Sequence, residues 1–346
     1  MKIAILAGDG IGPEITEEAV KVLKAVGDFE FEQALIGGVA FDKYGEHFPE
    51  ETRKICENAD AVLFGSVGGP VASKEAKWQG CETNSILALR KAFSFYANLR
   101  PVKLYKGLPC VLKDEIVEKG VDILCVRELL SCIYFGEHKT ENGRASDVMQ
   151  YTEDEVRAIA RIAFEAAMKR SKKVTSVDKA NVLDCSKLWR KVVEEVAKDY
   201  SECEFEHVLV DNMAMQIIKR PYDFDVLLMP NMFGDIISDE ASVLSSSLGM
   251  LPSASLNKDG FGLYEPSGGS APDIAGRGAA NPIGQILSAA MMLKYSFNMH
   301  KEHDAIVAAV DMAIADGYRT ADIAEKEHTF VSTDVMGDAI VKYINL

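Results

Sequence analysis

The sequence predicts an α/β protein with a largely parallel β-sheet. Short apolar runs alternate along the chain with amphipathic segments of helical period, which is the pattern of strand–helix–strand units. At roughly 150 residues per domain, the 346 residues correspond to about two domains. No Pro- or Ser-rich linker divides the chain. Two domains would therefore share strands or exchange segments, instead of following one another.

The individual elements follow from that alternation. Residues 2–7 form an apolar run that predicts a strand, and residues 13–26 carry apolar side chains at helical spacing, with Pro13 suited to the first turn. Further strands are predicted at 61–64, 122–126, 173–177, 206–210 and 225–229. Further helices are predicted at 153–169, 187–200, 235–247, 285–297 and 304–315. The polar segment 134–150 favours turns, and we expect a protruding arm that meets a partner subunit.

Composition excludes several classes of protein. The formal charge is −15, so nucleic acid is not expected as a partner, because its phosphate backbone would be repelled. No apolar run reaches the ~18 residues that cross a bilayer, and the first apolar run is too short for a secretory signal. We expect a cytoplasmic protein with no membrane partner. Seven cysteines without a C-x-x-C pair predict reduced thiols, and His300 and His303 are expected on a surface helix without a metal.

A glycine-rich turn, Gly8-Asp9-Gly10-Ile11-Gly12, lies between the first strand and the first helix. Dinucleotide-binding proteins have such a turn at this place, but with the spacing G-x-G-x-x-G. A tight structural turn is therefore favoured over a standard Rossmann site, in which Glu30 would be the ribose-binding acid.

Two aspartates indicate a metal site. Asp235 and Asp239 are four residues apart on a predicted helix, so their carboxylates share one face, where like charges repel unless a cation lies between them. Such a pair more often marks a solvated face, but the small and apolar neighbours weaken that alternative. Asp211 ends an apolar run, at a strand end where ligands of α/β sheets gather. Carboxylate oxygens suit Mg²⁺ or Mn²⁺.

Three arginines sit among apolar neighbours: Arg90, Arg100 and Arg127. Partly buried guanidinium groups require carboxylate or phosphate partners. An internal acid such as Glu128 is one alternative. The other, taken together with the aspartates, is a small polyanionic substrate that chelates a metal.

Proton transfer and cofactor binding have candidates as well. Lys179 follows an apolar run, and nearby positive charges would favour its neutral, proton-accepting form; a surface lysine is the alternative. Tyr134 ends the turn SCIYFG. The glycine-rich segment 267–280 would let backbone amides approach a ligand, and Asp273 would then accept hydrogen bonds from ribose hydroxyls. The alternative is a loop that only connects two elements. Asn281-Pro282 then starts a helix.

Long motifs link these candidates to one family. The motifs are LAGDGIGPEI, ANLRP, VREL, IYFG, VTSVDKANVL, LVDNMAMQ, NMFGDIISDEAS, LGMLPSASL and EPSGGSAPDIAGRGAANPIGQIL. Together they resemble the β-decarboxylating dehydrogenases, the family of isocitrate and isopropylmalate dehydrogenases, from the first residues to about Gly337. The resemblance implies an α/β fold that is not Rossmann. It implies a large cofactor-binding domain from 1–98 and 246–346, a central substrate and dimerisation domain at 99–245, and a cleft between them.

The resemblance also implies roles for the candidates. The substrate carboxylates would be bound by Arg90, Arg100 and Arg127. The acid–base pair would be Tyr134 and Lys179. Mg²⁺ or Mn²⁺ would be bound by Asp211, Asp235 and Asp239, and Asp211 would also contact the substrate. In a homodimer with shared active sites, Lys179 and Asp211 would come from the neighbouring subunit. NAD would bind through Glu265, Gly268, Gly269, Ser270, Ala271, Pro272, Asp273 and Asn281, with Asp273 selecting NAD over NADP.

Specificity would rest on Glu82, Ile86 and Leu87, ahead of Arg90. Two departures from the family pattern bear on the site. Gly268 stands where many members have a His beside the adenine, so that cofactor binding would depend more on Asn281 and backbone contacts. Leu130, Ser131 and Cys132 stand where the family usually has Thr-Gly-Gly.

The implied activity is oxidative decarboxylation of (2R,3S)-3-isopropylmalate to 4-methyl-2-oxopentanoate and CO₂ with reduction of NAD⁺, a step of leucine biosynthesis. An apolar pair at Ile86 and Leu87 suits an isopropyl group and leaves a third carboxylate unpaired. The alternatives are a related dehydrogenase acting on methylmalate, homoisocitrate, isocitrate or tartrate, and a non-catalytic dicarboxylate-binding protein.

Overall fold

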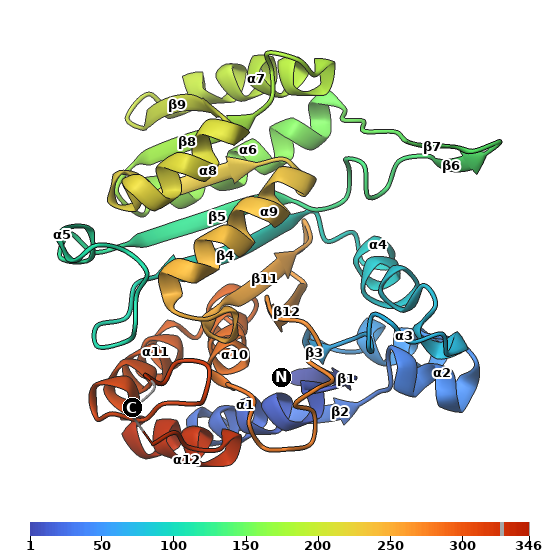
Figure 1. The fold of residues 1–346 in the computed structure, drawn as a ribbon, viewed down its shortest axis with the longest axis vertical. Helices are drawn as coiled ribbons and strands as arrows, with labels where there is room; N and C mark the ends of the chain where they lie inside the picture. The colour runs from blue at the N-terminus through green and yellow to red at the C-terminus, as the bar shows by residue number, and fades with distance from the viewer. Residues whose placement is uncertain (326–328, 346) are drawn as a thin grey trace. The chain divides into compact units, whose positions relative to one another are not determined.

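A computed structural model describes residues 1–325 and 329–345, and the chain forms two compact α/β units (Figure 1). Unit 1 consists of Met1–Ser94, Tyr105–Pro109 and Ser245–Leu346, and unit 2 of Phe95–Leu104 and Cys110–Leu244. Unit 1 therefore contains both ends of the chain.

Unit 1 contains five strands in the order β2-β1-β3-β12-β11, parallel except for the antiparallel pair β11–β12. The strands are β1 (Lys2–Gly8), β2 (Glu30–Gln33), β3 (Ala61–Ser66), β11 (Pro252–Leu256) and β12 (Gly262–Pro266). The helices are α1 (Gly12–Val26), α2 (Gly38–Tyr44), α3 (Glu50–Glu57), α4 (Ala88–Ala92), α10 (Ile283–Tyr295), α11 (His300–Ala315) and α12 (Thr333–Tyr343), with short helical turns η1 (Ala76–Trp78), η2 (Thr83–Leu87) and η6 (Leu248–Met250). Helix α10 is apolar on nearly every side, which explains why it is buried in the core of this unit.

Unit 2 contains five strands in the order β4-β5-β10-β8-β9, parallel except for the antiparallel pair β4–β5. The strands are β4 (Ala97–Lys103), β5 (Asp122–Glu128), β8 (Lys173–Asp178), β9 (Glu204–Leu209) and β10 (Val226–Met229). The helices are α5 (Asp114–Val117), α6 (Glu153–Met168), α7 (Asp184–Ala197), α8 (Val210–Lys219) and α9 (Asn231–Ser242), with turns η3 (Lys198–Tyr200) and η4 (Pro221–Asp223). A separate hairpin, β6 (His138–Glu141) and β7 (Arg144–Asp147), extends away from the sheet of unit 2 in Figure 1.

The prediction of an α/β fold with a largely parallel sheet is confirmed, with one antiparallel pair in each unit. The structure adds a detail on the disfavoured Rossmann alternative and another on the strand end predicted near Asp211. Glu30 is the first residue of β2 and lies 4.0 Å from Lys2, so it is not at the carboxyl end of the strand, where a ribose-binding acid would be needed. Asp211 lies in the first turn of α8, because β9 ends at Leu209.

The remaining composition-based expectations concern thiols, histidines and membranes. All seven cysteines are free thiols, and Cys56, Cys81, Cys125 and Cys132 are buried. On α11, His300 and His303 bond Asn298 and Asp304. Within residues 1–325 and 329–345, no helix combines the length and the apolar character that crossing a bilayer requires.

Candidate active site

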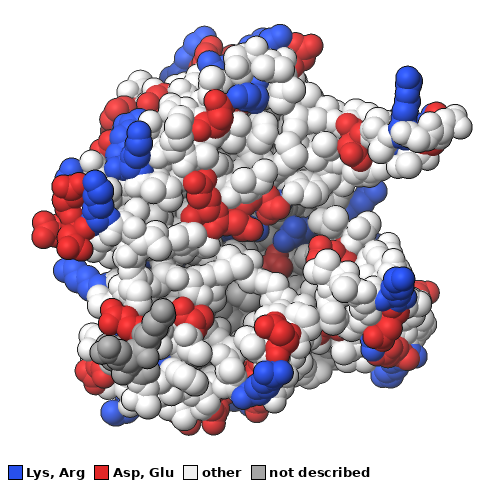
Figure 2. All heavy atoms as spheres, viewed as in Figure 1, with Lys and Arg blue, Asp and Glu red and all other residues white. Residues whose placement is uncertain are grey.

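Helix α9 brings two carboxylates together, as the four-residue spacing predicts. Oδ1 of Asp239 is 3.2 Å from Nη1 of Arg100, and Oδ1 of Asp235 is 3.7 Å from Nη2 of the same guanidinium group. Burial and the neighbouring charge of Asp235 raise the pKa of Asp239, while Arg100 opposes that shift. Acidic side chains gather over the α9 segment on the face shown in Figure 2. The two carboxylates form an anionic pair that a cation would stabilise.

Arg127, near the end of β5, is nearly inaccessible to solvent and is held from two directions. Its Nε and Nη2 donate to Oδ1 of Asn231, at 3.0 and 2.7 Å, and its Nη1 pairs with Asp235. Gly234 makes this approach possible, since a Cβ at that position would lie 2.8 Å from Cγ of Arg127. The hydroxyl of Tyr134 donates to Oδ2 of Asp235 at 2.9 Å. Burial, reinforced by the Asp235 charge, raises the pKa of Tyr134 to about 12.

Asn231 is a residue of the candidate site that the sequence reasoning missed. It lies four residues before Asp235, on the same face of α9, and this i, i+4 spacing within the motif NMFGD is the signal that could have identified it. The hydrogen bonds that hold Arg100 were not predicted either. Its Nε donates to Asn98 and its Nη1 to Ser238, each at 2.8 Å.

The alternative of internal acids as partners is confirmed for the three arginines, which pair with Glu265, Asp239 and Asp235, but Glu128, the example given for it, is not one of those partners. Neighbouring residues on a strand point to opposite faces, so Glu128 faces away from Arg127 and instead accepts the amide hydrogens of Leu130 at 2.7 Å and Ser131 at 3.1 Å. Burial raises the pKa of Glu128 to about 7. Cys132 follows with a φ of +73°, a left-handed conformation that suits the glycine that the family usually has at this position.

Lys179 and Asp211 form a second charged pair in unit 2. Lys179 follows the last residue of β8, and its backbone amide donates to Oγ of Ser186 at 3.1 Å. Its ammonium group pairs with Asp211, and this hydrogen bond lowers the pKa of Asp211. Both side chains are partly exposed, so the pair is accessible to another molecule.

The three aspartates do not meet within a single chain. In the part of the chain that the structure describes, no three His, Cys, Asp or Glu residues are arranged to hold a metal ion. Asp235 and Asp239 supply two carboxylates, whereas Asp211 is engaged with Lys179. The described residues of one chain therefore bring together two of the three carboxylates.

Unit 1 holds the remaining arginine and the proposed specificity residues. Nη2 of Arg90 donates to Oε1 of Glu265 at 2.8 Å, and both side chains are about nine-tenths buried. Nε of Arg90 is also buried and has no hydrogen-bond partner in the structure. Ile86 is buried, Leu87 is half-buried and Glu82 is exposed on the helical turn that leads to Arg90.

The glycine-rich segment of unit 1 is an open loop with a fixed base. A Cβ added at Gly268 or Gly269 would have no other atom within 4 Å, which leaves room for a ligand beside the backbone. The carbonyl oxygen of Ser270 accepts the amide of Ile11 at 2.9 Å. Ala271 and Pro272 follow it, and Asp273 is exposed.

Asn281, at the end of this loop, has a structural role. Its Oδ1 accepts the amide of Ile283, the first residue of α10, at 3.0 Å, while its Nδ2 donates to Asp322 at 3.1 Å. The preceding turn is fixed by the amide of Gly278, which donates to Glu14 at 2.9 Å.

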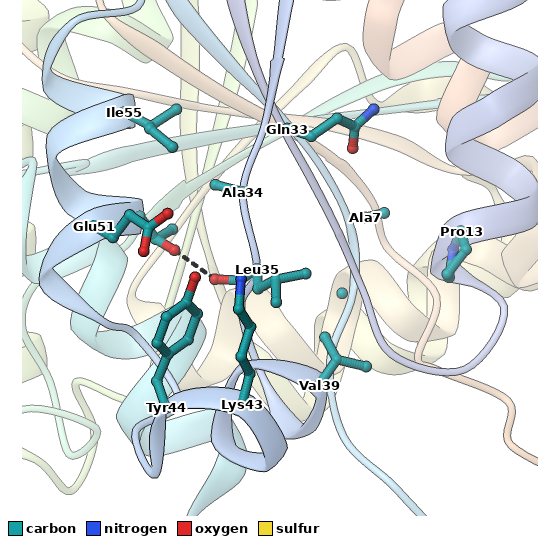
Figure 3. A pocket seen from close by; sticks show the side chains of 12 residues that line it. Ala7, Pro13, Gln33, Ala34, Leu35, Val39, Lys43, Tyr44, Glu51 and Ile55 are labelled. Atoms are coloured by element: carbon teal, nitrogen blue, oxygen red, sulfur yellow. Dashed lines mark hydrogen bonds between the residues drawn. The ribbon is translucent and has the colours of Figure 1, made fainter.

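A cavity of 440 Å³ lies elsewhere in unit 1 (Figure 3). It is lined by Ala7, Gly8, Pro13, Gln33, Ala34, Leu35, Val39, Lys43, Tyr44, Glu51, Thr52 and Ile55. In Figure 3 the side chains of Lys43, Tyr44 and Glu51 lie together on one wall. None of the residues expected to bind substrate, metal or NAD lines this cavity, although Gly8 of the glycine-rich turn does.

The chain matches known proteins over nearly its whole length. The sequence pattern of the isocitrate/isopropylmalate dehydrogenases matches residues 2–340. The 3-isopropylmalate dehydrogenase of Haemophilus influenzae is 55% identical over 354 residues, covering 99% of both chains. That of Aquifex aeolicus is 52% identical, covering 99% of this chain and 96% of the relative.

Solved structures agree with the sequence matches. The isocitrate dehydrogenase of Methylococcus capsulatus superposes with a TM-score of 0.89 at 33% identity, covering 99% of both chains. A β-decarboxylating dehydrogenase of Thermococcus kodakarensis gives a TM-score of 0.79 at 37% identity, covering 99% of this chain and 96% of that one. This chain belongs to the isocitrate/isopropylmalate dehydrogenase family.

Proposed function

We propose that this protein is a cytoplasmic 3-isopropylmalate dehydrogenase that uses NAD and a divalent metal. It would convert (2R,3S)-3-isopropylmalate to 4-methyl-2-oxopentanoate and CO₂ in leucine biosynthesis. The observation that supports this most directly is the cluster in which Arg127 of β5 and Tyr134 both bond Asp235 of α9. The relatives named 3-isopropylmalate dehydrogenase, at 52–55% identity over nearly the full length, point to the same substrate.

Substrate binding is assigned to the arginines. Arg100 and Arg127 are fixed by asparagine and serine side chains, so their guanidinium groups are already oriented to receive carboxylates. Arg90 is proposed as the third, and its buried, unpartnered Nε is a donor that a substrate carboxylate would satisfy.

The donor set fits Mg²⁺ or Mn²⁺. Asp235 and Asp239 lie side by side and Asp211 would join them from a second subunit, which gives the oxygen ligands that these ions prefer. A bound divalent ion would act as a Lewis acid toward the substrate oxygens. Burial raises the pKa of Asp239, and the neighbouring charge of Asp235 adds to that shift.

Proton transfer is assigned to Lys179 and Tyr134. Lys179 would accept the proton of the C2 hydroxyl as the C2 hydrogen leaves as hydride to NAD⁺. The C3 carboxylate then departs as CO₂, and the electron pair of the broken bond is protonated at C3. Tyr134 would donate that proton from its phenol hydroxyl, which is oriented by its hydrogen bond to Asp235.

The loop from Glu265 to Asn281 is proposed to bind NAD. The open backbone at Gly268 and Gly269 gives room for a nucleotide, and the exposed carboxylate of Asp273 could accept hydrogen bonds from ribose hydroxyls. The same charge would repel a 2′-phosphate and disfavour NADP. Asn281 would act mainly through its hydrogen bond to Ile283, which fixes the end of the loop.

Gly10 offers a test of how this loop is supported. Its φ is +60°, and a Cβ there would lie 1.9 Å from the carbonyl oxygen of Ser270, so Gly10→Ala should displace the loop. We expect the KM for NAD to rise roughly tenfold or more, because a displacement of about 1 Å misaligns a binding group. Gly45→Ala is the matched control, since Gly45 has a φ of +75° and no atom within 4 Å. Gly45→Ala should lose about 1 kcal/mol of unfolding free energy, and Gly10→Ala should lose more because its Cβ also clashes with Ser270. An unchanged KM for NAD in Gly10→Ala would remove the role given to this turn.

A substrate panel tests the proposed activity. NADH formation is measured with Mg²⁺ on 3-isopropylmalate, malate, methylmalate, homoisocitrate, isocitrate and tartrate. We expect kcat/KM for 3-isopropylmalate to exceed that for isocitrate by about 100-fold or more, because a third carboxylate would face the apolar Ile86 and Leu87. An equal kcat/KM for another substrate of the panel would assign the chain to the related dehydrogenase that acts on that substrate. No NADH with any of them would favour a dicarboxylate-binding protein.

A homodimer is proposed from the exposed surface of unit 2. Met215 on α8 and Ile236 on α9 are 54% and 58% exposed, on the two contacting helices that carry Asp211 and Asp235. Apolar side chains grouped on such helices mark an interaction surface. The hairpin β6–β7 is exposed along its whole length, as an arm that clasps a second subunit would be. Met215, Ile236 and the hairpin β6–β7 all lie within residues 99–245, the range in which the dimerisation domain is expected.

A further inference from the structure

Asp9 is buried in the glycine-rich turn but has no role in the activity proposed above. Its side chain is 2% exposed, and three backbone amides converge on it. Oδ2 accepts from Gly38 at 2.9 Å and Gly68 at 3.0 Å, and Oδ1 accepts from Val39 at 2.9 Å. The thiol of Cys81 donates to Oδ2 from 3.8 Å. A buried carboxylate with this many donors is a strong connection between segments distant in the sequence.

The first connection is to α2. Gly38 and Val39 are the first residues of this helix, whose N-cap, Gly37, has no side chain to cap it. Asp9 therefore supplies the missing cap from another part of the chain. The backbone of Asp9 is fixed as well, since its amide donates to Ser66 at 2.7 Å.

The other two connections lead toward the proposed specificity residues. A Cβ on Gly68 would lie 3.6 Å from Oε1 of Glu82 and 3.8 Å from Oγ of Ser270. Gly68, whose amide is held by Asp9, therefore lies next to both Glu82 and Ser270. Cys81 directly precedes Glu82. Burial raises the pKa of Cys81 to about 11, so its thiol remains a donor.

We propose that Asp9 is a positioning residue, which sets the helical turn carrying Glu82, Ile86 and Leu87 against the cofactor loop at Ser270. It touches neither substrate nor cofactor, and acts through the Gly68 segment and Cys81. This inference rests on the proposed function, because it assigns a cause to the substrate selectivity of that site.

Asp9→Asn is the main test. The amide keeps one acceptor oxygen but turns an NH₂ group toward at least one backbone N–H, so the cluster must shift. We expect KM for 3-isopropylmalate to rise and the selectivity ratio, kcat/KM for 3-isopropylmalate over that for malate, to fall by roughly tenfold, since small displacements of positioned groups have effects of this size. A merely structural role would lower the melting temperature and the active fraction while leaving KM and the selectivity ratio unchanged.

Matched variants keep the test decisive. Asp225→Asn removes another buried carboxylate, bonded to Arg170 at 2.7 Å in unit 2, and should lower stability without changing the selectivity ratio. If Asp9→Asn does not fold, Cys81→Ala removes one donor and Cys81→Ser restores a hydroxyl; the ratio should fall in the first and recover in the second. Unchanged selectivity in Asp9→Asn, or in Cys81→Ala where that replaces it, would overturn the inference. A wild-type protein inactive on 3-isopropylmalate would instead refute the proposed function.

Discussion

Replacing Lys179 by Met should lower kcat by about 10³-fold while metal-dependent binding of 3-isopropylmalate stays measurable, as expected when a general base is lost. Methionine keeps the apolar stem of the lysine but has no amine to accept the hydroxyl proton. The fold should tolerate the change, because Asp211, the partner left behind, has a side chain 60% exposed to solvent. The measurements are single-turnover NADH formation and calorimetric binding of the substrate with Mg²⁺.

Lys187→Met is the control for this variant. Lys187 lies on the helix that follows and pairs with Asp184 at 2.7 Å on the surface, so its loss should leave kcat unchanged. Near-normal turnover in Lys179→Met would discard the assignment of the base. Loss of binding as well as turnover would mean that Lys179 holds the substrate instead of moving a proton.

The fold could be predicted where the spacing of apolar residues along the sequence shows which face of a helix or strand is buried. Helices such as α6 (Glu153–Met168) were found because one face is apolar, and the capping box formed by Thr152 and Glu155 marks the start of that helix. Strand β4 (Ala97–Lys103) was not predicted, since Arg100 and Pro101 interrupt its apolar pattern. The structure shows why a charged residue is tolerated there, because Arg100 is bonded to Asn98 and Ser238.

The candidate site was predictable only where its partners are close in the sequence. The shared face of Asp235 and Asp239 follows from helical spacing, and α9 confirms it. The pair of Arg90 and Glu265 joins residues 175 positions apart, and no local pattern reports such a contact. For the same reason the sequence indicated a turn at Asp9 but not the segments that its carboxylate connects.

Asp235→Asn should abolish metal binding and lower kcat/KM by roughly 10³-fold or more, because a Lewis acid contributes several kcal/mol to such a reaction. The amide is neutral, so Asp239 alone would face the cation from this subunit, and the Nδ2 of the amide would repel it. Mn²⁺ binding followed by electron paramagnetic resonance reports the loss directly. Glu240→Gln, one residue beyond Asp239 on α9, removes a charge outside the proposed ligand set and should bind Mn²⁺ normally. Normal Mn²⁺ affinity in Asp235→Asn would refute the metal assignment.

Mixing the two inactive variants tests whether the active site is shared. If Lys179 of one subunit serves Asp235 of the other, a dimer of Lys179→Met with Asp235→Asn has one site in which both residues are native and one in which neither is. Random pairing makes about half of the dimers mixed, so about a quarter of the wild-type activity should return. If both residues acted in the same chain, every site would carry one defect and no activity would return. The rescue therefore depends on the two charged groups of unit 2, Lys179 with Asp211 and Asp235 with Asp239, meeting across a subunit boundary.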